Sequence, residues 1–291
     1  MFQIGARTIG QGAPAYVVAE MAWSHDGSLD KSKIIIDGAA TAGADAINFH
    51  LTHLPDYMVP FYGIGPGRVS GGSDVLDVYR YLESINLNFD AIAQLAAHAK
   101  AHGLAVSAMC NDPASCKFAV ANISPDMLMI HPSSIHDEAF VRLMAAPGKP
   151  LVLYTGGLHL AEIERALAWA RAENNNNLVL QHGFQSYPTA LEDNRLHYIA
   201  TLKRLFGLPV AFADHTDGDD PMAMIVPLLA LAMGADMVEK HITHDRAAKG
   251  EDYESAFGPA EFKTFTQRVR ASELTFGSRA WRPLSEREMK Y

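Results

Sequence analysis

The sequence has few cysteines, few positive charges and no long uninterrupted apolar run. Only Cys110 and Cys116 occur among 291 residues, so a disulfide scaffold and a cysteine-rich zinc site are both excluded. The longest apolar stretch, residues 222–233, contains Pro227 and is shorter than the roughly 20 residues that cross a bilayer. The opening MFQIGARTIG lacks the basic and apolar regions of a secretory signal, which predicts a cytoplasmic protein.

The charge balance narrows the class of partner. The chain has 24 Lys and Arg against 33 Asp and Glu, a formal net charge of −9. A net negative charge repels phosphate backbones and anionic lipid surfaces. With 48% hydrophobic and 20% charged residues, the composition is that of a globular enzyme. We therefore expect a small-molecule substrate, no nucleic-acid or membrane partner, and a homo-oligomer.

Short apolar runs alternate with helical patterns along the whole chain. The predicted strands are residues 16–20, 45–50, 104–109, 126–130, 150–155, 177–182, 209–213 and 236–241. The clearest helical patterns lie between them, at residues 31–42, 89–102, 160–172, 194–206 and 222–233. Glycines that favour positive φ follow several of these patterns, at Gly43, Gly103, Gly207 and Gly234. Eight such units predict an α/β fold, a (β/α)8 TIM barrel.

The predicted barrel is one domain over residues 1–291, with a long loop at about 51–88 and a short tail at 279–291. An open doubly wound sheet is the alternative, but it normally has a glycine-rich phosphate loop after its first strand. The GQGAP segment at residues 10–14 precedes that strand instead. Because long loops on the carboxyl face of a barrel shape sites, segment 51–75 is a candidate lid over the barrel mouth.

Histidines follow two neighbouring strands at the end of the barrel where catalytic groups gather. His215 follows the seventh predicted strand and His241 ends the eighth. Either one alone is more often a structural residue, but together their imidazoles can share a divalent metal with open positions for a substrate. Asp214 and Glu239 are candidate acceptors that would orient the two rings.

Four stretches carry a family resemblance. AEMAWSHDGSLDKSKIIIDGAATAGADAINFH, QHGFQSYPTALEDNRL, FADHTDGDDP and VEKHITHDRAAKGEDYESAFGPAEF resemble, in this order, the sialic acid (N-acetylneuraminate) synthase family. Members are TIM barrels that condense phosphoenolpyruvate with an N-acylated amino sugar, using a divalent metal. The resemblance implies that His215 and His241 bind manganese, zinc or a similar ion, and that Glu20, Tyr187 and Asp252 are catalytic.

The departures from that family concern the donor substrate. Members have lysines that bind the phosphate of phosphoenolpyruvate at positions that here read Asn48 and Met129. Neither residue supplies a positive charge, so the usual phosphate pocket is predicted to be lost. Candidate replacement cations are Arg68 in the long loop, Lys240 in the last strand, and Arg246 and Lys249 after it. The sequence also ends before the antifreeze-like domain of sialic acid synthases, so we expect that domain to be absent.

The predicted activity is a metal-dependent, aldol-type carbon–carbon condensation on a sugar or sugar acid, with doubtful use of phosphoenolpyruvate. Further substrate contacts are assigned to residues at the strand ends and in the loops after them: Asn48, His50, His131, His182 and Gln185. Four alternatives stay open: a synthase with a rebuilt anion site, an aldolase or lyase on a non-phosphorylated substrate, a metal-dependent hydrolase, and a barrel that binds without catalysis. The hydrolase is disfavoured because the first strand has no His-x-His pair.

Overall fold

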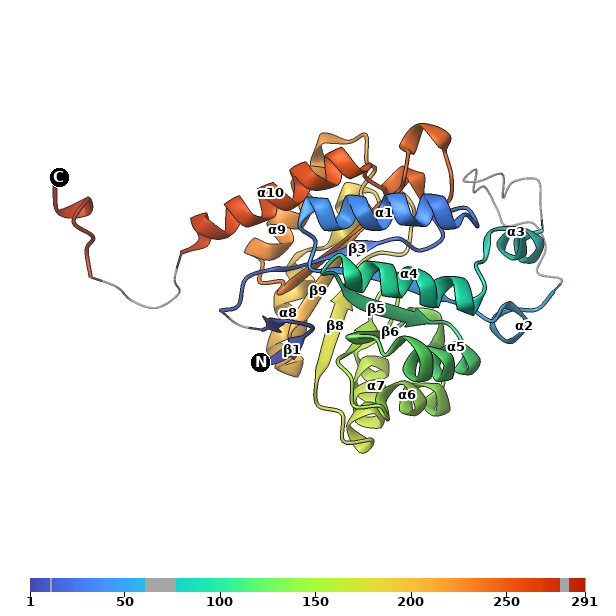
Figure 1. The fold of residues 1–291 in the computed structure, drawn as a ribbon. Helices are drawn as coiled ribbons and strands as arrows, with labels where there is room; N and C mark the ends of the chain where they lie inside the picture. Colours follow the sequence, from blue (N-terminus) through green and yellow to red (C-terminus); the bar gives the residue numbers. More distant parts are fainter. Residues whose placement is uncertain (11, 61–76, 278–282, 291) are drawn as a thin grey trace.

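The computed structural model describes residues 1–10, 12–60, 77–277 and 283–290 (Figure 1). Eight parallel strands close into a barrel in the order β10-β3-β4-β5-β6-β7-β8-β9. Their bounds are β3 Tyr16–Glu20, β4 Ala46–Leu51, β5 Ala105–Cys110, β6 Met127–Ile130, β7 Leu151–Tyr154, β8 Leu178–His182, β9 Val210–Asp214 and β10 Met237–His241. Every strand begins and ends within one residue of its predicted bounds, and the predicted TIM barrel is confirmed.

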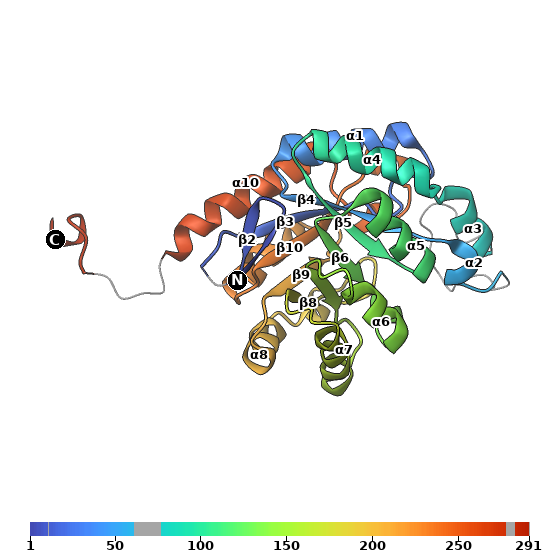
Figure 2. The same ribbon diagram turned by 60° about the horizontal axis from the view of Figure 1, so that its bottom comes forward.

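Helices cover the outside of the strands. They are α1 Leu29–Ala42, α2 Leu54–Tyr57, α3 Val78–Ile85, α4 Phe89–Ala101, α5 Pro113–Phe118, α6 Glu138–Ala145, α7 Leu160–Ala172, α8 His197–Phe206, α9 Val226–Ala232 and α10 Pro259–Phe276. Helices α10, α1 and α4 lie side by side on one wall, and α6, α7 and α8 lie on the opposite wall (Figure 2). Helix α1 begins where the Ser28 side chain accepts from the Lys31 backbone N–H, and it ends at Gly43 with a φ of 81°.

Side chains of the strands alternate between two apolar layers. Val18, Met129, Val152 and Met237 belong to the layer inside the barrel. Their sequence neighbours belong to the larger layer between strands and helices. Because both faces of each strand are buried, the runs are apolar on both faces, which is why they are recognisable in the sequence.

The helix predicted over residues 222–233 is a different structure. A 3₁₀ turn covers Pro221–Met224, and α9 begins only at Val226. Pro227 lies in the first turn of α9, where its missing N–H has no partner to lose. The apolar pattern is continuous, but the helix is not, and Pro227 explains why α9 begins only at this point.

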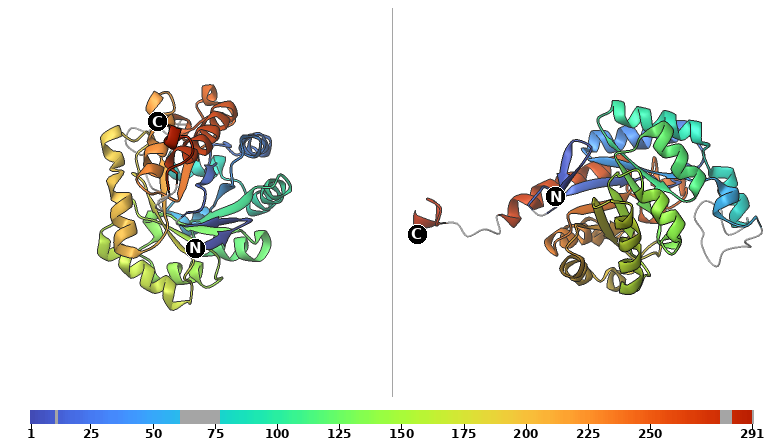
Figure 3. Two further views of the ribbon diagram at one scale, coloured as in Figure 1. Left: turned by 90° about the vertical axis from the view of Figure 1, so that its left-hand side faces the viewer. Right: turned by 90° about the horizontal axis from the view of Figure 1, so that it is seen from below.

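An antiparallel hairpin that the sequence did not predict lies at the amino end of the barrel. Strands β1 Phe2–Ile4 and β2 Arg7–Ile9 pair through Gly5, which has a φ of 57°. Ile4 and Ile9 are buried in the apolar layer inside the barrel. The left view in Figure 3 shows this amino-terminal segment near the centre of the ring of helices. The hairpin closes the amino end, and the polar residues gather at the carboxyl end.

The long segment after β4 is described at its two ends. Helix α2 and helix α3 form a small apolar cluster through Leu54, Tyr81, Leu82 and Ile85. Residues 61–76, including Arg68, lie outside the described residues, so the lid over residues 51–75 stays a prediction. Within the part of the chain that is described, no helix has the length and apolar character needed to span a membrane.

Candidate active site

A cavity of about 350 Å³ opens at the carboxyl ends of the strands. The structure brings most of the predicted site residues together around it: Glu20, His50, His131, Gln185, Tyr187, His215, His241 and Asp252. They come from β3, β4, β10 and the loops after β6, β8, β9 and β10. The convergence follows from the parallel barrel, in which all strands deliver their carboxyl ends to one face.

His215 and His241 face each other across part of this cavity. Their ring centroids are 5.3 Å apart, and the Tyr187 ring lies 4.3 Å from His215 and 5.6 Å from His241. The His215 Nδ1 lies 2.7 Å from the backbone oxygen of Phe184, so Nδ1 carries the proton and Nε2 keeps its lone pair. Burial lowers the pKa of His215 to about 4, which keeps the ring in the neutral form that binds metal.

The donors around this pair fit a divalent ion. Glu20, Glu239 and Asp252 line the same cavity, and Asp252 Oδ2 lies 3.9 Å from His241 Nδ1. Imidazole nitrogens with carboxylate oxygens suit manganese or zinc. Among the described residues, no group of three His, Cys, Asp or Glu side chains that includes both rings has ligand atoms that all lie within 4.8 Å of one another. An ion held by the pair would therefore take its other ligands from substrate or water.

Two buried glutamates lie in the barrel beside the histidines. Glu20 accepts the Ala22 N–H at 2.6 Å and also the Asn48 side-chain amide, and Glu239 Oε1 accepts the Gln181 amide at 2.6 Å. Burial raises the pKa of Glu239 to about 8. Burial, and then the charge of Glu239, raise the pKa of Glu20 well above its ordinary value. The pair therefore retains a proton at neutral pH, as a proton donor in catalysis must.

Several polar atoms inside the barrel lack a hydrogen-bond partner among the described residues. They are Asn48 Oδ1, His50 Nδ1, Gln181 Oε1 and Glu239 Oε2. Buried polar atoms are nearly always paired, so such a group of unpaired atoms marks a place for water or a polar ligand. A hydroxyl-rich molecule has the donors and acceptors that these atoms require.

The described lining of the cavity contains no lysine and no arginine. It does contain four carboxyl groups, those of Glu20, Glu239, Glu251 and Asp252. Burial lowers the pKa of His50 to about 3 and lowers that of His131 as well, so these rings are neutral at pH 7. This lining does not favour a highly charged anion.

Both positions of the missing family lysines are buried in the barrel. Met129 has no exposed surface and packs in the inner apolar layer. Asn48 is also fully buried, and its amide is held by Glu20. The structure therefore provides no positive charge at either position.

Two predicted substrate residues, His182 and Lys240, face away from the cavity because they occupy outward positions of their strands. Lys240 Nζ is fully buried between Asp214 Oδ2 at 2.7 Å and the Thr216 carbonyl at 2.9 Å. His182 Nε2 lies 2.8 Å from the Asn194 carbonyl, and its ring packs near Tyr198 and Phe212. Arg68 lies outside the described residues.

The expected orienting role of the acidic neighbours is not what the structure has. Asp214 bonds Lys240 and the Thr216 hydroxyl, and the ring of His215 is oriented instead by the carbonyl of Phe184. Glu239 bonds Gln181. Successive side chains of a strand alternate between its two faces. Asp214 therefore points away from the face of His215. Glu239 likewise points away from the face of Lys240.

Several other residues that line the cavity were not predicted from the sequence. Tyr81, from α3, donates its hydroxyl to Glu251 at 2.6 Å. Trp23 packs edge-on against His50 with ring centroids 4.8 Å apart. Tyr154 ends β7 and is buried. Tyr154 was recognisable as a polar strand end, but the pairing of Tyr81 with Glu251 joins segments 170 positions apart and left no local signal.

Comparison with known proteins gives a consistent family. A family model described as the NeuB family matches residues 35–280. Spore coat polysaccharide biosynthesis protein SpsE of Bacillus subtilis is 29% identical over 98% of this chain and 75% of its own length. Pseudaminic acid synthase of Campylobacter jejuni is 30% identical over 90% of this chain and 75% of its own.

The solved structures agree with this at the level of the fold. N-acetylneuraminic acid synthetase from Leptospira borgpetersenii, crystallised with citrate, superposes with a TM-score of 0.87 at 24% identity. The match covers 99% of this chain and 94% of that one. The SpsE structure from Bacillus subtilis gives a TM-score of 0.81 at 26% identity, over 99% of this chain and 76% of that one.

Proposed function

This chain belongs to the NeuB family, and from that membership we propose that it catalyses a metal-dependent, aldol-type carbon–carbon condensation on a sugar or sugar-acid substrate. Named relatives include synthases of pseudaminic acid and of N,N'-diacetyllegionaminic acid, so the reaction class is that of a transferase or synthase. The observation that carries the proposal is the shared cavity of His215, His241 and the buried Glu20 and Glu239.

The residues have distinct roles in this proposal. His215 and His241 hold the ion, which when bound polarises a carbonyl oxygen of the substrate. Glu239 has a raised pKa, and its Oε2 has no hydrogen-bond partner among the described residues, so it exchanges a proton with the reacting group. Glu20 and Asp252 orient an acceptor hydroxyl or take part in that transfer. Tyr187, which was predicted to be catalytic, contacts the substrate together with Gln185.

Tyr187 and Gln185 form one unit on the loop after β8. The Tyr187 hydroxyl lies 3.2 Å from Gln185 Oε1, and the Tyr187 ring packs against His215. A hydroxyl and an amide at this place supply directional hydrogen bonds to a polyol without adding charge. His50 and His131, both neutral and at the cavity wall, extend the same kind of contact.

We further propose that the donor lacks a phosphate. Phosphate recognition relies on charge-assisted hydrogen bonds worth about 1.5–3 kcal/mol each. The described lining offers four carboxyl groups and no lysine or arginine for that purpose. A donor of the pyruvate type, which carries a smaller charge, suits this lining better. The runner-up is a phosphoenolpyruvate-dependent synthase whose cation is Arg68.

Calorimetry separates the two donors. Phosphoenolpyruvate and pyruvate are titrated into the manganese-loaded protein, with Arg68→Gln as a matched variant. The proposal expects that phosphoenolpyruvate binds with micromolar affinity neither to wild type nor to Arg68→Gln. Micromolar binding that Arg68→Gln abolishes would establish the runner-up instead.

The reaction class is tested by product analysis. Wild-type protein, pyruvate, manganese and a panel of N-acylated amino sugars are incubated, and the products are analysed by mass spectrometry. A product whose mass equals the sum of donor and sugar supports condensation. A parallel incubation supplies the protein and manganese with a panel of sugar acids. Cleavage of a sugar acid there, with no condensation in the first incubation, would assign the protein to the lyases.

A further inference from the structure

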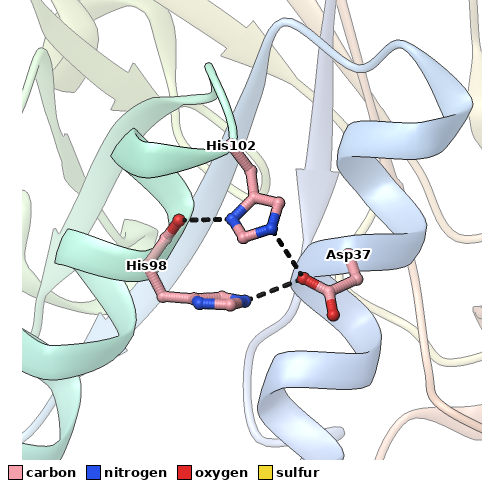
Figure 4. Close-up of side chains that lie close together, drawn as sticks. All are labelled: Asp37, His98 and His102. Atoms are coloured by element: carbon pink, nitrogen blue, oxygen red, sulfur yellow. Dashed lines mark hydrogen bonds and ion pairs between the residues drawn. The ribbon is translucent and has the colours of Figure 1, made fainter.

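A second group of metal-ligand residues lies outside the cavity, where α1 packs against α4 on the outer wall of the barrel (Figure 4). Asp37 comes from α1, and His98 and His102 come from the last part of α4 and its C-cap. One ligand atom of each side chain lies within 4.8 Å of the other two. Within the described ranges, no other trio of His, Cys, Asp or Glu meets this distance.

The spacing of these atoms fits a zinc-sized ion. Residues four apart on a helix lie on the same face, which brings His98 and His102 together. Their Nε2 atoms lie 2.8 Å and 3.6 Å from Asp37 Oδ1. Neighbouring ligands of a tetrahedral zinc ion, bound at about 2.0–2.1 Å, are about 3.3 Å apart. The two observed distances fall on either side of that value, so small side-chain rotations admit the ion.

The tautomer of His102 is set by its own helix. Its Nδ1 lies 2.9 Å from the His98 carbonyl oxygen, which only accepts, so Nδ1 carries the proton. The lone pair of a neutral His102 is then on Nε2, the atom that faces Asp37. This is how metal-binding histidines are usually held, with one ring nitrogen bonded to a carbonyl and the other on the ion.

For the neutral form of His102, the same contact is unfavourable without a cation. His102 Nε2 and Asp37 Oδ1 are both acceptors and face each other at 3.6 Å. A metal ion placed between them replaces repulsion by two coordinate bonds. It also takes the position of the proton through which His98 Nε2 contacts the same oxygen at 2.8 Å, so binding releases a proton or moves it to Nδ1.

We propose that Asp37, His98 and His102 form a binding site for a borderline divalent ion of the zinc class. Two imidazoles and one carboxylate favour such an ion over magnesium or calcium, which prefer oxygen ligands. The side chains are 53%, 28% and 43% exposed, so the ion enters from solvent and water completes its shell. It joins α1 to α4 and stabilises that wall of the barrel.

The site is tested by counting zinc equivalents. The full chain is freed of metal with a chelator and titrated with Zn²⁺ in a calorimeter at neutral pH. The variant His98→Ala/His102→Ala is expected to bind one equivalent fewer than wild type. His215→Ala/His241→Ala is expected to keep the wall equivalent, and His197→Ala, at an exposed position of α8, is expected to match wild type.

Thermal unfolding is a second readout. Saturating Zn²⁺ is expected to raise the Tm of wild type and of His215→Ala/His241→Ala, because a ligand of the folded state stabilises it. It is expected to leave His98→Ala/His102→Ala with a smaller rise than wild type. This inference is independent of the proposed reaction, since the wall site survives loss of the cavity histidines.

The two metal hypotheses fail in different ways. If the cavity binds no zinc, wild type takes up a single equivalent, and His98→Ala/His102→Ala removes it. The wall site is overturned if His98→Ala/His102→Ala binds as many equivalents as wild type with the same Kd. In that case Asp37 only links the two helices through hydrogen bonds.

Discussion

The inward and outward faces of β10 both carry polar side chains, but these side chains differ in how completely they are hydrogen-bonded. Glu239 and His241 point into the barrel and line the cavity, where Glu239 Oε2 has no hydrogen-bond partner among the described residues. Lys240, between them, points outward and is fully buried in contact with Asp214, Thr216 and the Phe257 ring. Polar residues at strand ends therefore mark a site only where their bonding is incomplete; where it is complete, they hold the fold.

The largest expected effect is on the outward face. Replacing Lys240 with Met leaves the Asp214 carboxylate buried without its partner, and breaking such a pair costs about 3–5 kcal/mol. Urea unfolding measures the loss. The double variant Lys240→Met/Asp214→Asn should recover part of it, since no uncompensated charge remains. Full stability of Lys240→Met, with turnover abolished, would instead place Lys240 in catalysis.

A buried histidine near the mouth gives an acid-dependent loss of similar size. His25 is buried, accepts the Gly27 N–H through Nδ1, and has its pKa lowered by burial to about 4. Because the folded pKa lies below the ordinary 6.5, this stability is complete above pH 6.5 and is lost as the pH falls toward 4. At about 1.4 kcal/mol per pKa unit, the loss approaches about 3 kcal/mol.

The measurement for His25 is unfolding free energy against pH for wild type and His25→Gln. The glutamine amide oxygen can accept the Gly27 N–H but does not titrate in this range. The difference between the two proteins should change steadily from pH 6.5 to pH 4, to the disadvantage of wild type. Parallel pH profiles would contradict the assigned titration.

On the inward face, Glu239→Gln should remove proton transfer while keeping the shape of the side chain. General acid–base groups contribute about a hundredfold or more to turnover, so kcat should fall by at least that factor. Unfolding in urea should show that the variant is folded. The matched control is the double variant Lys240→Met/Asp214→Asn, which changes two outward residues, leaves no uncompensated buried charge and should keep kcat. Unchanged kcat in Glu239→Gln would remove this residue from the proposed chemistry.

The smallest effect is expected for His182, the second outward residue. His182→Leu loses the hydrogen bond to the Asn194 carbonyl, a contribution of about 1 kcal/mol, and keeps apolar contact with Tyr198 and Phe212. Stability should fall slightly, and kcat/KM for the identified substrate should not change. A selective rise in KM would return His182 to the substrate site.

The sequence by itself determined the barrel and much of the site. Strand and helix periods are local, so all eight strands could be placed to within one residue. Parallel strands meet at one end, so His215, His241 and Glu20 could be assigned to one mouth before any coordinates. The alternation of side chains along strand residues 239–241 also indicates that Lys240 points away from the face of its two neighbours.

Only the tertiary structure decided which polar groups are satisfied and which distant segments meet. Three contacts join residues far apart in sequence. They are the hydrogen bond between Tyr81 and Glu251, the packing of Ile4 and Ile9 into the inner layer of the barrel, and the approach of Asp37 to His98. No local pattern encodes such contacts, because they depend on how whole helices and strands pack. The pKa values that define the proposed chemistry depend on the same packing, since burial is their largest cause.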